Sequence, residues 1–296
     1  MPSLLISIVI YNKPIKELLL LKSLKNDEDK IDIFIYDNSK LPQEVPTFEN
    51  VNIYYEHDEN NSGVSRAYNQ AYKKAKELNK KLLLVLDQDS SFELSFVEQY
   101  MKMHQVYKND YIYAPIVCDE KKTKIYSPAF MSNFVGKVQS FEEFIYEETY
   151  SLVGKSVINS GLMIPLEIFE KIGGYNEKLR LDFSDVYFIE KYKELNSKIV
   201  LVNVYLKHSI SGDEGKDFAR EYSRFRYYCS ACKELERALN TSAFWSSSRR
   251  LIRLVLKYKR LSFIKIYFEY YLKGKEIGRF QYVWLPIMVK SILKNS

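Results

Sequence analysis

The order of apolar and polar residues predicts alternating strands and helices over the first 117 residues. Runs rich in apolar residues are typical of strands buried on both faces, whereas apolar residues at steps of three or four predict helices. The expected strands cover residues 4–10, 31–36, 51–55, 82–86 and 111–117. The expected helices cover residues 14–25, with Pro14 in the first turn, 64–78 and about 96–107. This alternation predicts an α/β domain with a mainly parallel sheet flanked by helices.

The pattern is weaker in the middle of the chain. Residues 119–155 are polar, acidic and aromatic, and they predict no regular element. A helix at Val186–Leu195 and a strand at Ile199–Leu206 are then expected to continue the same domain.

From Phe218 onward the spacing of apolar residues is helical. A first helix is expected up to Leu239, and the serine-rich segment Thr241–Ser248 is the expected hinge before further helix. We therefore predict an α/β domain at residues 1–215 and a C-terminal helical extension at residues 216–296.

Composition predicts a globular protein in a reducing compartment. With 296 residues, 46% of them apolar, the chain can bury a sizeable core. Its three cysteines are too few for a disulfide framework, and Cys229 and Cys232 are expected to pack inside a helical core. No cleavable leader is recognisable before Leu4, and no run reaches the roughly 18 apolar residues of a membrane-spanning helix. A cytoplasmic location is expected.

The positive charge is concentrated at the C-terminal end. The whole chain has a formal net charge of +6, and residues 249–296 hold twelve Lys or Arg against Glu269 and Glu276. Such a segment suits an anionic lipid or nucleic-acid surface, although solvated helices are also often rich in lysine. No nucleic-acid reading motif accompanies it, so a nucleic-acid partner is not expected.

Polar residues stand where three predicted strands end and where one predicted helix begins. They are Tyr11 and Asn12, Asp37 and Asn38, Asp87, Gln88 and Asp89, and Asn61 and Gly63. Ligands of open α/β sheets bind beyond the carboxyl ends of the strands, so this edge is the expected nucleotide site. Asp37 can accept the N3–H of a pyrimidine base, and Asp87 can bind a ribose hydroxyl. Helix capping is the alternative explanation for Asp87 and Asn61.

Seven short motifs follow one another in the first 230 residues. They are Ile6–Asn12, Tyr36-Asp37-Asn38-Ser39, Asn61-x-Gly63-x-Ser65-x-Ala67-x-Asn69, Asp87-Gln88-Asp89-Ser90, Ile158-Asn159-Ser160-Gly161, Gly173-Gly174-Tyr175-Asn176-Glu177 and Leu181-Asp182-x-x-Asp185. This ordered set resembles the family 2 glycosyltransferases with the GT-A fold, and the rhamnosyltransferase branch is the most similar part of that family.

The resemblance implies a role for each matching residue. Asp37 would contact the base, Asp87 the ribose, and Asp89 a divalent metal, Mn²⁺ or Mg²⁺, that bridges the diphosphate of a dTDP- or UDP-linked sugar. His208 is a second candidate metal ligand. The residues implied for the donor nucleotide are Tyr11, Asn12, Asp37, Asn38, Asn61, Gly63, Arg66, Asp87 and Gln88. Those implied for the acceptor or the sugar are Ser160, Gly161 and Asp182.

Asp185 is the candidate catalytic base. Inverting transfer needs one carboxylate within hydrogen-bond reach of the acceptor hydroxyl. The alternative is that Asp185 caps the helix at Val186–Leu195. Two departures from the branch pattern bear on the site: Tyr187 replaces a second acid, and His208-x-x-x-Gly212 replaces the usual H-x-x-G.

The resemblance implies an inverting, metal-dependent transferase. The expected reaction moves rhamnose from dTDP-rhamnose to a hydroxyl of a cell-surface polysaccharide, such as capsule or cell wall, or of a lipid-linked acceptor. UDP-galactose, UDP-glucose or a furanose donor would use the same positions. The alternative from another class is a catalytically idle nucleotide-sugar-binding scaffold at the membrane.

The basic C-terminal segment offers three open interpretations. Arg249–Arg260 contains six cations and no acid, with Leu251, Leu254 and Val255 at helical spacing, and the apolar face continues from Phe263 to Tyr271. A helix of this type can lie on the inner face of the cell membrane. Packing on the catalytic domain, or self-association into a homo-oligomer through apolar faces, explains the pattern equally well.

Overall fold

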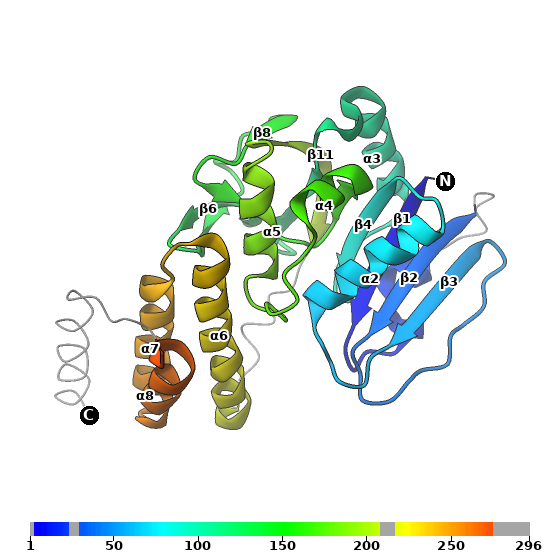
Figure 1. Cartoon of the computed structure of the whole chain (residues 1–296). Coiled ribbons are helices and arrows are strands. Elements are labelled where there is room, and N and C mark those ends of the chain that lie inside the picture. The colour runs from blue at the N-terminus through cyan, green and yellow to red at the C-terminus, as the bar shows by residue number, and fades with distance from the viewer. Residues whose placement is uncertain (1–2, 24–29, 208–216, 275–296) are drawn as a thin grey trace. The chain divides into compact units, whose positions relative to one another are not determined.

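The computed structural model describes residues 3–23, 30–207 and 217–274 (Figure 1). The chain divides into two compact units. The first unit comprises residues 1–132 and 136–210, and the second comprises residues 133–135 and 211–296. Each unit is considered by itself.

One large mixed sheet forms the centre of the first unit. Its main order is β3-β2-β1-β4-β10-β5-β11-β8, and β6, β7 and β9 continue it beyond β5. The strands are β1 Leu4–Ile10, β2 Ile31–Asp37, β3 Val51–His57, β4 Leu82–Asp87, β5 Tyr113–Cys118, β6 Lys124–Ser132, β7 Val135–Ser140, β8 Thr149–Ser151, β9 Lys155–Ser156, β10 Leu162–Pro165 and β11 Lys198–Lys207.

The parallel part of this sheet confirms the predicted alternation of strands and helices. β1 pairs in parallel with both β2 and β4, β2 pairs in parallel with β3, and β5 pairs in parallel with β11. β10 is an unpredicted strand that lies antiparallel between β4 and β5. The segment 119–155, which predicts no element by pattern, contains the short strands β6 to β9.

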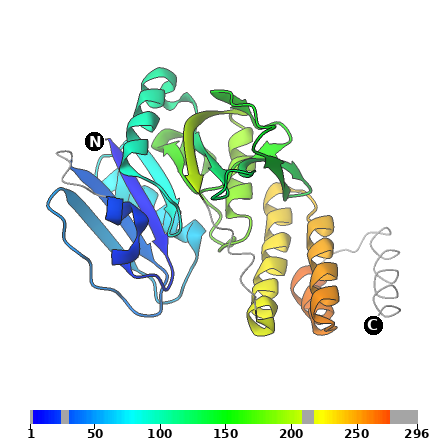
Figure 2. The same ribbon diagram turned by 180° about the vertical axis from the view of Figure 1, so that it is seen from behind.

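Helices cover both faces of the sheet. The helices of this unit are η1 Ile15–Glu17, α1 Leu19–Ser23, α2 Val64–Glu77, α3 Leu94–Tyr107, η2 Lys108–Asp110, α4 Leu166–Ile172 and α5 Ser184–Lys193. Side chains of α2, α4 and α5 share one apolar core with the strands, and these helices lie in front of the sheet in Figure 1. Side chains of α1 and α3 belong to a second core on the opposite face, seen from behind in Figure 2.

The predicted helix at residues 14–25 is wrong in length. The structure has only a 3₁₀ turn, Ile15–Glu17, and a five-residue helix, Leu19–Ser23, because Leu18 between them is extended, with φ −62° and ψ 126°. The backbone N–H of Ile15 donates to Gln43 Oε1, at 3.0 Å. This N–H would have no partner within a helix that begins at Pro14, so Gln43 anchors the first turn, and the helix is interrupted by the extended Leu18. Residues 24 and 25 lie outside the described residues.

The second unit is helical, as predicted. Its elements are α6 Phe218–Leu239, α7 Phe244–Tyr258, α8 Ser262–Ile266 and the π-helix η3 Tyr267–Leu272. Cys229 and Cys232 are free and fully buried on α6, which confirms the expectation that they pack in a helical core. No described helix is long and apolar enough to span a membrane.

The predicted hinge at Thr241–Ser248 is wrong over most of its length. α7 begins at Phe244, and Ser246, Ser247 and Ser248 are buried within it. Ser246 and Ser247 donate to carbonyl groups three residues earlier, at 2.9 Å each. A serine hydroxyl within a helix can donate a hydrogen bond to a backbone carbonyl of the preceding turn, so a high serine content alone does not predict a linker.

Candidate active site

The carboxyl ends of three neighbouring strands bring the predicted nucleotide residues to one edge of the sheet. β2, β1 and β4 are adjacent and parallel, and their registers pair Ile10 with Asp37 and Val9 with Asp87. Tyr11 and Asn12 leave β1 at the same level and are exposed. The loops after these strands therefore form one continuous polar edge.

Hydrogen bonds connect these loops to one another. The Tyr11 backbone N–H donates to Gln88 Oε1, at 2.7 Å, and Lys13 Nζ donates to the Gln88 carbonyl oxygen, also at 2.7 Å. The Asn12 N–H donates to Ser39 Oγ, at 2.8 Å. Gln88 therefore orients the loop after β1, and its side chain is already engaged by the backbone.

Asp37 lies inside the edge rather than on it. The residue is 0% exposed, and its carboxylate accepts hydrogen bonds from the Ser39 N–H, at 2.8 Å, Gln43 Nε2, at 3.0 Å, and Tyr55 OH, at 2.8 Å. These three donors hold the loop after β2. Because both carboxylate oxygens already accept hydrogen bonds and the residue is buried, direct contact between Asp37 and a base remains a prediction.

Gly63 fixes the start of α2 against the loop that precedes α5. Its φ is +96°, and a Cβ at this position would lie 2.1 Å from the Arg180 carbonyl oxygen. The Gly63 N–H donates to Asn38 Oδ1, at 3.3 Å, and the Val64 N–H donates to the Arg180 carbonyl, at 2.7 Å. Only glycine permits this close approach.

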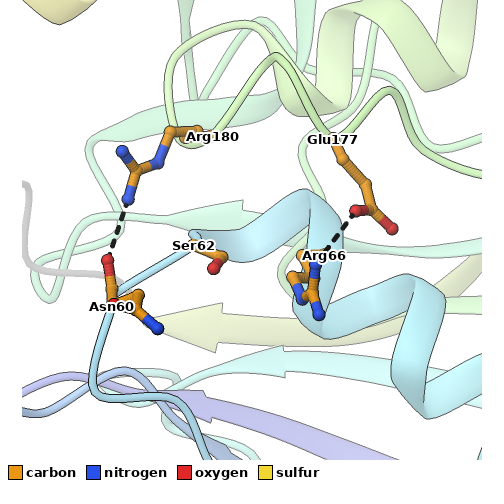
Figure 3. A pocket seen from close by; sticks show the side chains of 5 residues that line it. All are labelled: Asn60, Ser62, Arg66, Glu177 and Arg180. Atoms are coloured by element: carbon orange, nitrogen blue, oxygen red, sulfur yellow. Dashed lines mark hydrogen bonds and ion pairs between the residues drawn. The ribbon is translucent and has the colours of Figure 1, made fainter.

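A pocket of about 390 Å³ opens beside the start of α2 (Figure 3). It is lined by Asn60, Ser62, Arg66, Glu177 and Arg180. Arg66 is paired with Glu177, at 3.7 Å, and Arg180 donates to the Asn60 and Asn61 carbonyl groups. Asn61 is exposed next to this pocket and has a left-handed backbone, with φ 49°. Two guanidinium groups at a helix N-terminus suit a phosphate or another anion.

Asp87 and Asp185 belong to one cluster with two buried tyrosines. Tyr68 OH donates to Asp87 Oδ1, at 3.1 Å, and the Tyr68 and Tyr175 rings lie 5.0 Å apart. Burial, followed by the charges of Asp185 and Asp87, raises the pKa of Tyr175. The end of β4 and the start of α5 therefore meet at this pair of tyrosines.

The Asp185 carboxyl group has an altered acidity. Burial, and to a smaller extent the negative charges of Asp87 and Asp182, raise the pKa of Asp185 to about 6, against the lowering effect of the Val186 N–H. A carboxyl group with this pKa is largely ionised at neutral pH but is a stronger base than an ordinary aspartate. Such a group suits proton abstraction from a hydroxyl.

The structure refines the alternative in which Asp185 is a helix cap. α5 begins at Ser184, so Phe183 occupies the N-cap position, with φ 66°, and makes no side-chain capping bond. Asp185 lies in the first helical turn, where its Oδ1 accepts the Val186 N–H, at 2.8 Å. The half-buried Asp182 stands just before the helix. Asp185 satisfies one helix-end donor and still has a second carboxylate oxygen.

The proposed metal position has few protein ligands. Asp89 is half-buried two residues beyond Asp87, and His208 lies outside the described residues. No group of three or more His, Cys, Asp or Glu gathers within the described ranges. A cation held by a nucleotide diphosphate needs only one or two carboxylates from the protein, so Asp89 alone is a sufficient protein ligand for Mn²⁺ or Mg²⁺.

Ser160 and Gly161 lie behind the end of β4 and the loop Asp87–Ser90. Ser160 Oγ is hydrogen-bonded to Ser90 Oγ, and the Gly161 N–H donates to the Val85 carbonyl, at 2.9 Å. Both residues are buried. In this structure they support the loop at Asp87–Ser90, and their contact with a sugar remains a prediction.

Several residues of the site are absent from the sequence-based set. Tyr68 counts as an apolar position of the helical pattern, although its hydroxyl group reaches Asp87. Tyr175 is part of a matching motif without an assigned role, and its hydroxyl donates to Asn159 Oδ1, at 2.9 Å. Glu177 ends the same motif, also without an assigned role, and Arg180 has no signal beyond its charge. A buried tyrosine usually finds a hydrogen-bond partner for its hydroxyl group, so the tyrosine at position 68 of the helical pattern is a signal for a polar contact.

Comparisons with known proteins agree with this architecture. Staphylococcus aureus TarS, residues 1–349, matches with a TM-score of 0.55 and 12% identity over 98% of this chain and 81% of that chain. The same fragment in complex with UDP-GlcNAc matches with a TM-score of 0.55, 14% identity and the same coverage. GalNAc-T7 with UDP, GalNAc and Mn²⁺ matches with a TM-score of 0.51 and 13% identity over 90% of this chain and 58% of that chain.

These likenesses show a shared GT-A fold, in agreement with the predicted fold class. A comparison with curated protein sequences finds no match. Residues 6–172 match the family described as Glycosyl transferase family 2, which is more than half of the chain. The chain therefore belongs to glycosyl transferase family 2.

Proposed function

We propose that the protein transfers a sugar, with inversion, from a nucleoside diphosphate donor to a hydroxyl group, and that Asp185 is the base. The observation that supports this proposal best is the cluster of Asp87, Asp185, Tyr68 and Tyr175 at the carboxyl edge of the sheet. A base with a raised pKa next to the predicted donor site is what such a transfer requires.

The donor nucleotide would occupy the edge formed by the loops after β1, β2 and β4. The exposed Tyr11 offers a ring surface for a base, and Asp87 offers a carboxylate for a ribose. Arg66 and Arg180, beside the α2 N-terminus, provide positive charge near a diphosphate. When bound by Asp89, a divalent cation supplies charge neutralisation for the departing diphosphate.

In this mechanism the protein's own groups position the acceptor and remove its proton. Asp185 accepts the proton of the acceptor hydroxyl as the new glycosidic bond forms and the bond to the diphosphate breaks. Tyr68 holds the neighbouring Asp87 carboxylate by its hydrogen bond, at 3.1 Å, so the two carboxylates keep separate partners.

We propose dTDP-rhamnose as the donor because the motif order is most similar to the rhamnosyltransferase branch. UDP-linked hexoses or a furanose remain the second candidates, and one of the structural neighbours is a complex with UDP-GlcNAc. The residues described at the edge would contact the nucleotide and the diphosphate rather than the sugar ring. The proposed acceptor is a hydroxyl of a cell-surface glycan or of a lipid-linked precursor.

The experiment that tests this function compares wild-type protein with Asp185→Asn. Donor sugars are screened by thermal stabilisation with Mn²⁺ or Mg²⁺ present, because a ligand that binds only the native state raises the melting temperature. With the donor found, we expect Asp185→Asn to keep its affinity and to lose transfer by a factor of about 10³ or more. Wild-type transfer should rise as the pH passes through about 6, as Asp185 loses its proton.

Asp89→Ala is the matched variant for the metal position. It should lose the metal-dependent part of donor binding while Asp185→Asn retains it. Transfer by Asp185→Asn at near wild-type rate would reject Asp185 as base.

The second candidate function is the catalytically idle scaffold, which is favoured by Tyr187 in place of a second acid. Donor binding without hydrolysis or transfer at any pH would support the scaffold.

A further inference from the structure

The apolar stripe that suggests a membrane helix from sequence is not available to a membrane. Leu251, Leu254 and Val255 are each 3% exposed, and Phe263 and Tyr267 are fully buried. These residues form the interior of the second unit, where α6, α7 and α8 pack on one another (Figure 1). Any contact made by α7 with another surface must therefore use its opposite face.

That opposite face combines cations with large apolar side chains. It consists of Trp245, Arg249, Ile252, Arg253 and Leu256, which we call the outer face of α7. With 3.6 residues per turn, these positions fall within about 100° of the helix circumference. Trp245 is 49% exposed and Leu256 is 56% exposed, and both arginines are exposed.

The charge around the outer face has a single sign. Residues 241–268 contain no Asp or Glu, and their cations are Arg249, Arg250, Arg253, Lys257, Lys259, Arg260 and Lys265. Arg250 lies over the Tyr228 ring, at 4.1 Å, and Arg260 lies near Phe218, at 5.8 Å. Arg250 and Arg260 therefore contact aromatic rings of the second unit, whereas Arg249 and Arg253 extend from the outer face.

We propose that the outer face of α7 binds the surface of an anionic lipid bilayer. Arginine attracts lipid phosphates, tryptophan favours the interface between headgroups and acyl chains, and a leucine on the same helix face enters the apolar boundary. The helix would lie in the plane of the surface, with its buried face still packed on α6. This inference uses no residue of the proposed catalytic site and does not depend on the proposed reaction.

Charge argues against the other occupants of this face. A two-fold pair of chains joined through it would bring Arg249 and Arg253 of both copies together, with no acid in residues 241–268 to separate them. Nucleic acid is bound mainly through phosphate contacts, which do not account for the exposed Trp245 and Leu256 on either side of the two arginines. An anionic bilayer uses both kinds of side chain.

The test measures co-flotation of the full chain with vesicles of phosphatidylcholine alone or with added phosphatidylglycerol. We expect binding only to the anionic vesicles, weakened by salt. Arg249→Gln combined with Arg253→Gln should reduce the partition constant by about 30-fold, the factor given by two residues at about 1 kcal/mol each. Trp245→Ser combined with Leu256→Ser should also reduce it.

The matched control changes the same residue classes on α3 of the first unit, with Lys102→Gln and Val106→Ser. Both residues are exposed there, and this variant should bind vesicles like wild type. In a Trp284→Phe background, the remaining tryptophan should shift its emission to shorter wavelength on anionic vesicles. Equal binding by the outer-face variants and wild type would overturn the proposal. So would a dimer or an oligonucleotide complex that depends on Trp245 and Leu256 in the absence of vesicle binding.

Discussion

Asp185 binds its proton more tightly in the folded protein than in the unfolded chain. Its pKa rises from 3.8 to about 6 on folding, chiefly because the carboxyl group is buried. Between these two values the native state holds more protons, so the stability of the fold falls as the pH rises from about 4 to about 6. The contribution of Asp185 to stability is favourable below this window and is lost above it.

Asp185→Asn should therefore stabilise the protein at neutral pH while removing its proposed activity. An amide keeps the acceptor for the Val186 N–H and carries no buried charge. We expect a gain of about 1–3 kcal/mol at about pH 7.5 that disappears near pH 4. Thermal melting of both proteins across this range measures it.

The control for this prediction is Glu143→Gln, which removes one exposed carboxylate and changes the net charge equally. A pH-independent difference between Asp185→Asn and wild type would show that Asp185 is not the group whose charge opposes folding. The same variant serves both assays, so loss of transfer by unfolding can be recognised at once from the melting curve.

At the residue scale, the sequence predicts well which strand ends hold the polar residues of the site. It predicts less well which ligand group each of these side chains can contact. Asp87, at the end of β4, is predicted as a donor ligand and lies at the expected edge. Asp37, at the end of β2 on the other side of β1, is fully enclosed. The difference arises from Gln43 and Tyr55, which reach Asp37 from outside its motif. Partners that come from distant segments are not visible in a local pattern.

Among the elements, α2 depends most directly on one residue. Gly63 has a backbone conformation, φ 96° and ψ 179°, that is essentially restricted to glycine, and the Arg180 carbonyl occupies the space of a side chain. Since the same carbonyl accepts the Val64 N–H, it cannot move away without losing that bond.

Gly63→Ala should destabilise the first unit by more than about 2 kcal/mol and weaken donor binding. The measurement is the urea midpoint of unfolding, together with donor affinity. Gly154→Ala is the control, because Gly154 also has a positive φ, 65°, but a Cβ added there would have no neighbouring atom within 4 Å. It should cost about 1 kcal/mol. Equal losses at the two positions would mean that the Arg180 contact is unimportant.

Elements with long, regular patterns are the ones that sequence predicts well. The strands at Leu4–Ile10 and Leu82–Asp87 and the helix at Val64–Glu77 follow their patterns closely. β10 has only four residues and is antiparallel between longer strands, so its apolar run gives no sign of its direction. The helix predicted at 14–25 is interrupted because Leu18 has an extended backbone.

At the scale of the whole molecule, the two proposals concern different units: the proposed sugar transfer involves residues of the first unit, and the proposed membrane binding involves α7 of the second. Sequence places a domain boundary at residue 215, and the second compact unit begins at residue 211 and also includes residues 133–135. The basic character of the C-terminal segment is evident in the sequence, but its exposed side is not. Leu251 and Leu256 are equally apolar by type, and only packing separates the 3% exposed residue from the 56% exposed one.

The last prediction is that catalysis and vesicle binding can be lost independently. Arg249→Gln with Arg253→Gln should leave donor hydrolysis in solution at the wild-type rate, because these exposed side chains belong to the second unit and the proposed catalytic residues belong to the first. Asp185→Asn should bind anionic vesicles like wild type. Both variants are measured in both assays, at the same salt concentration. Loss of hydrolysis in the arginine variant without vesicles present would mean that α7 supports the catalytic residues, and the separation of roles between the two units would then be wrong.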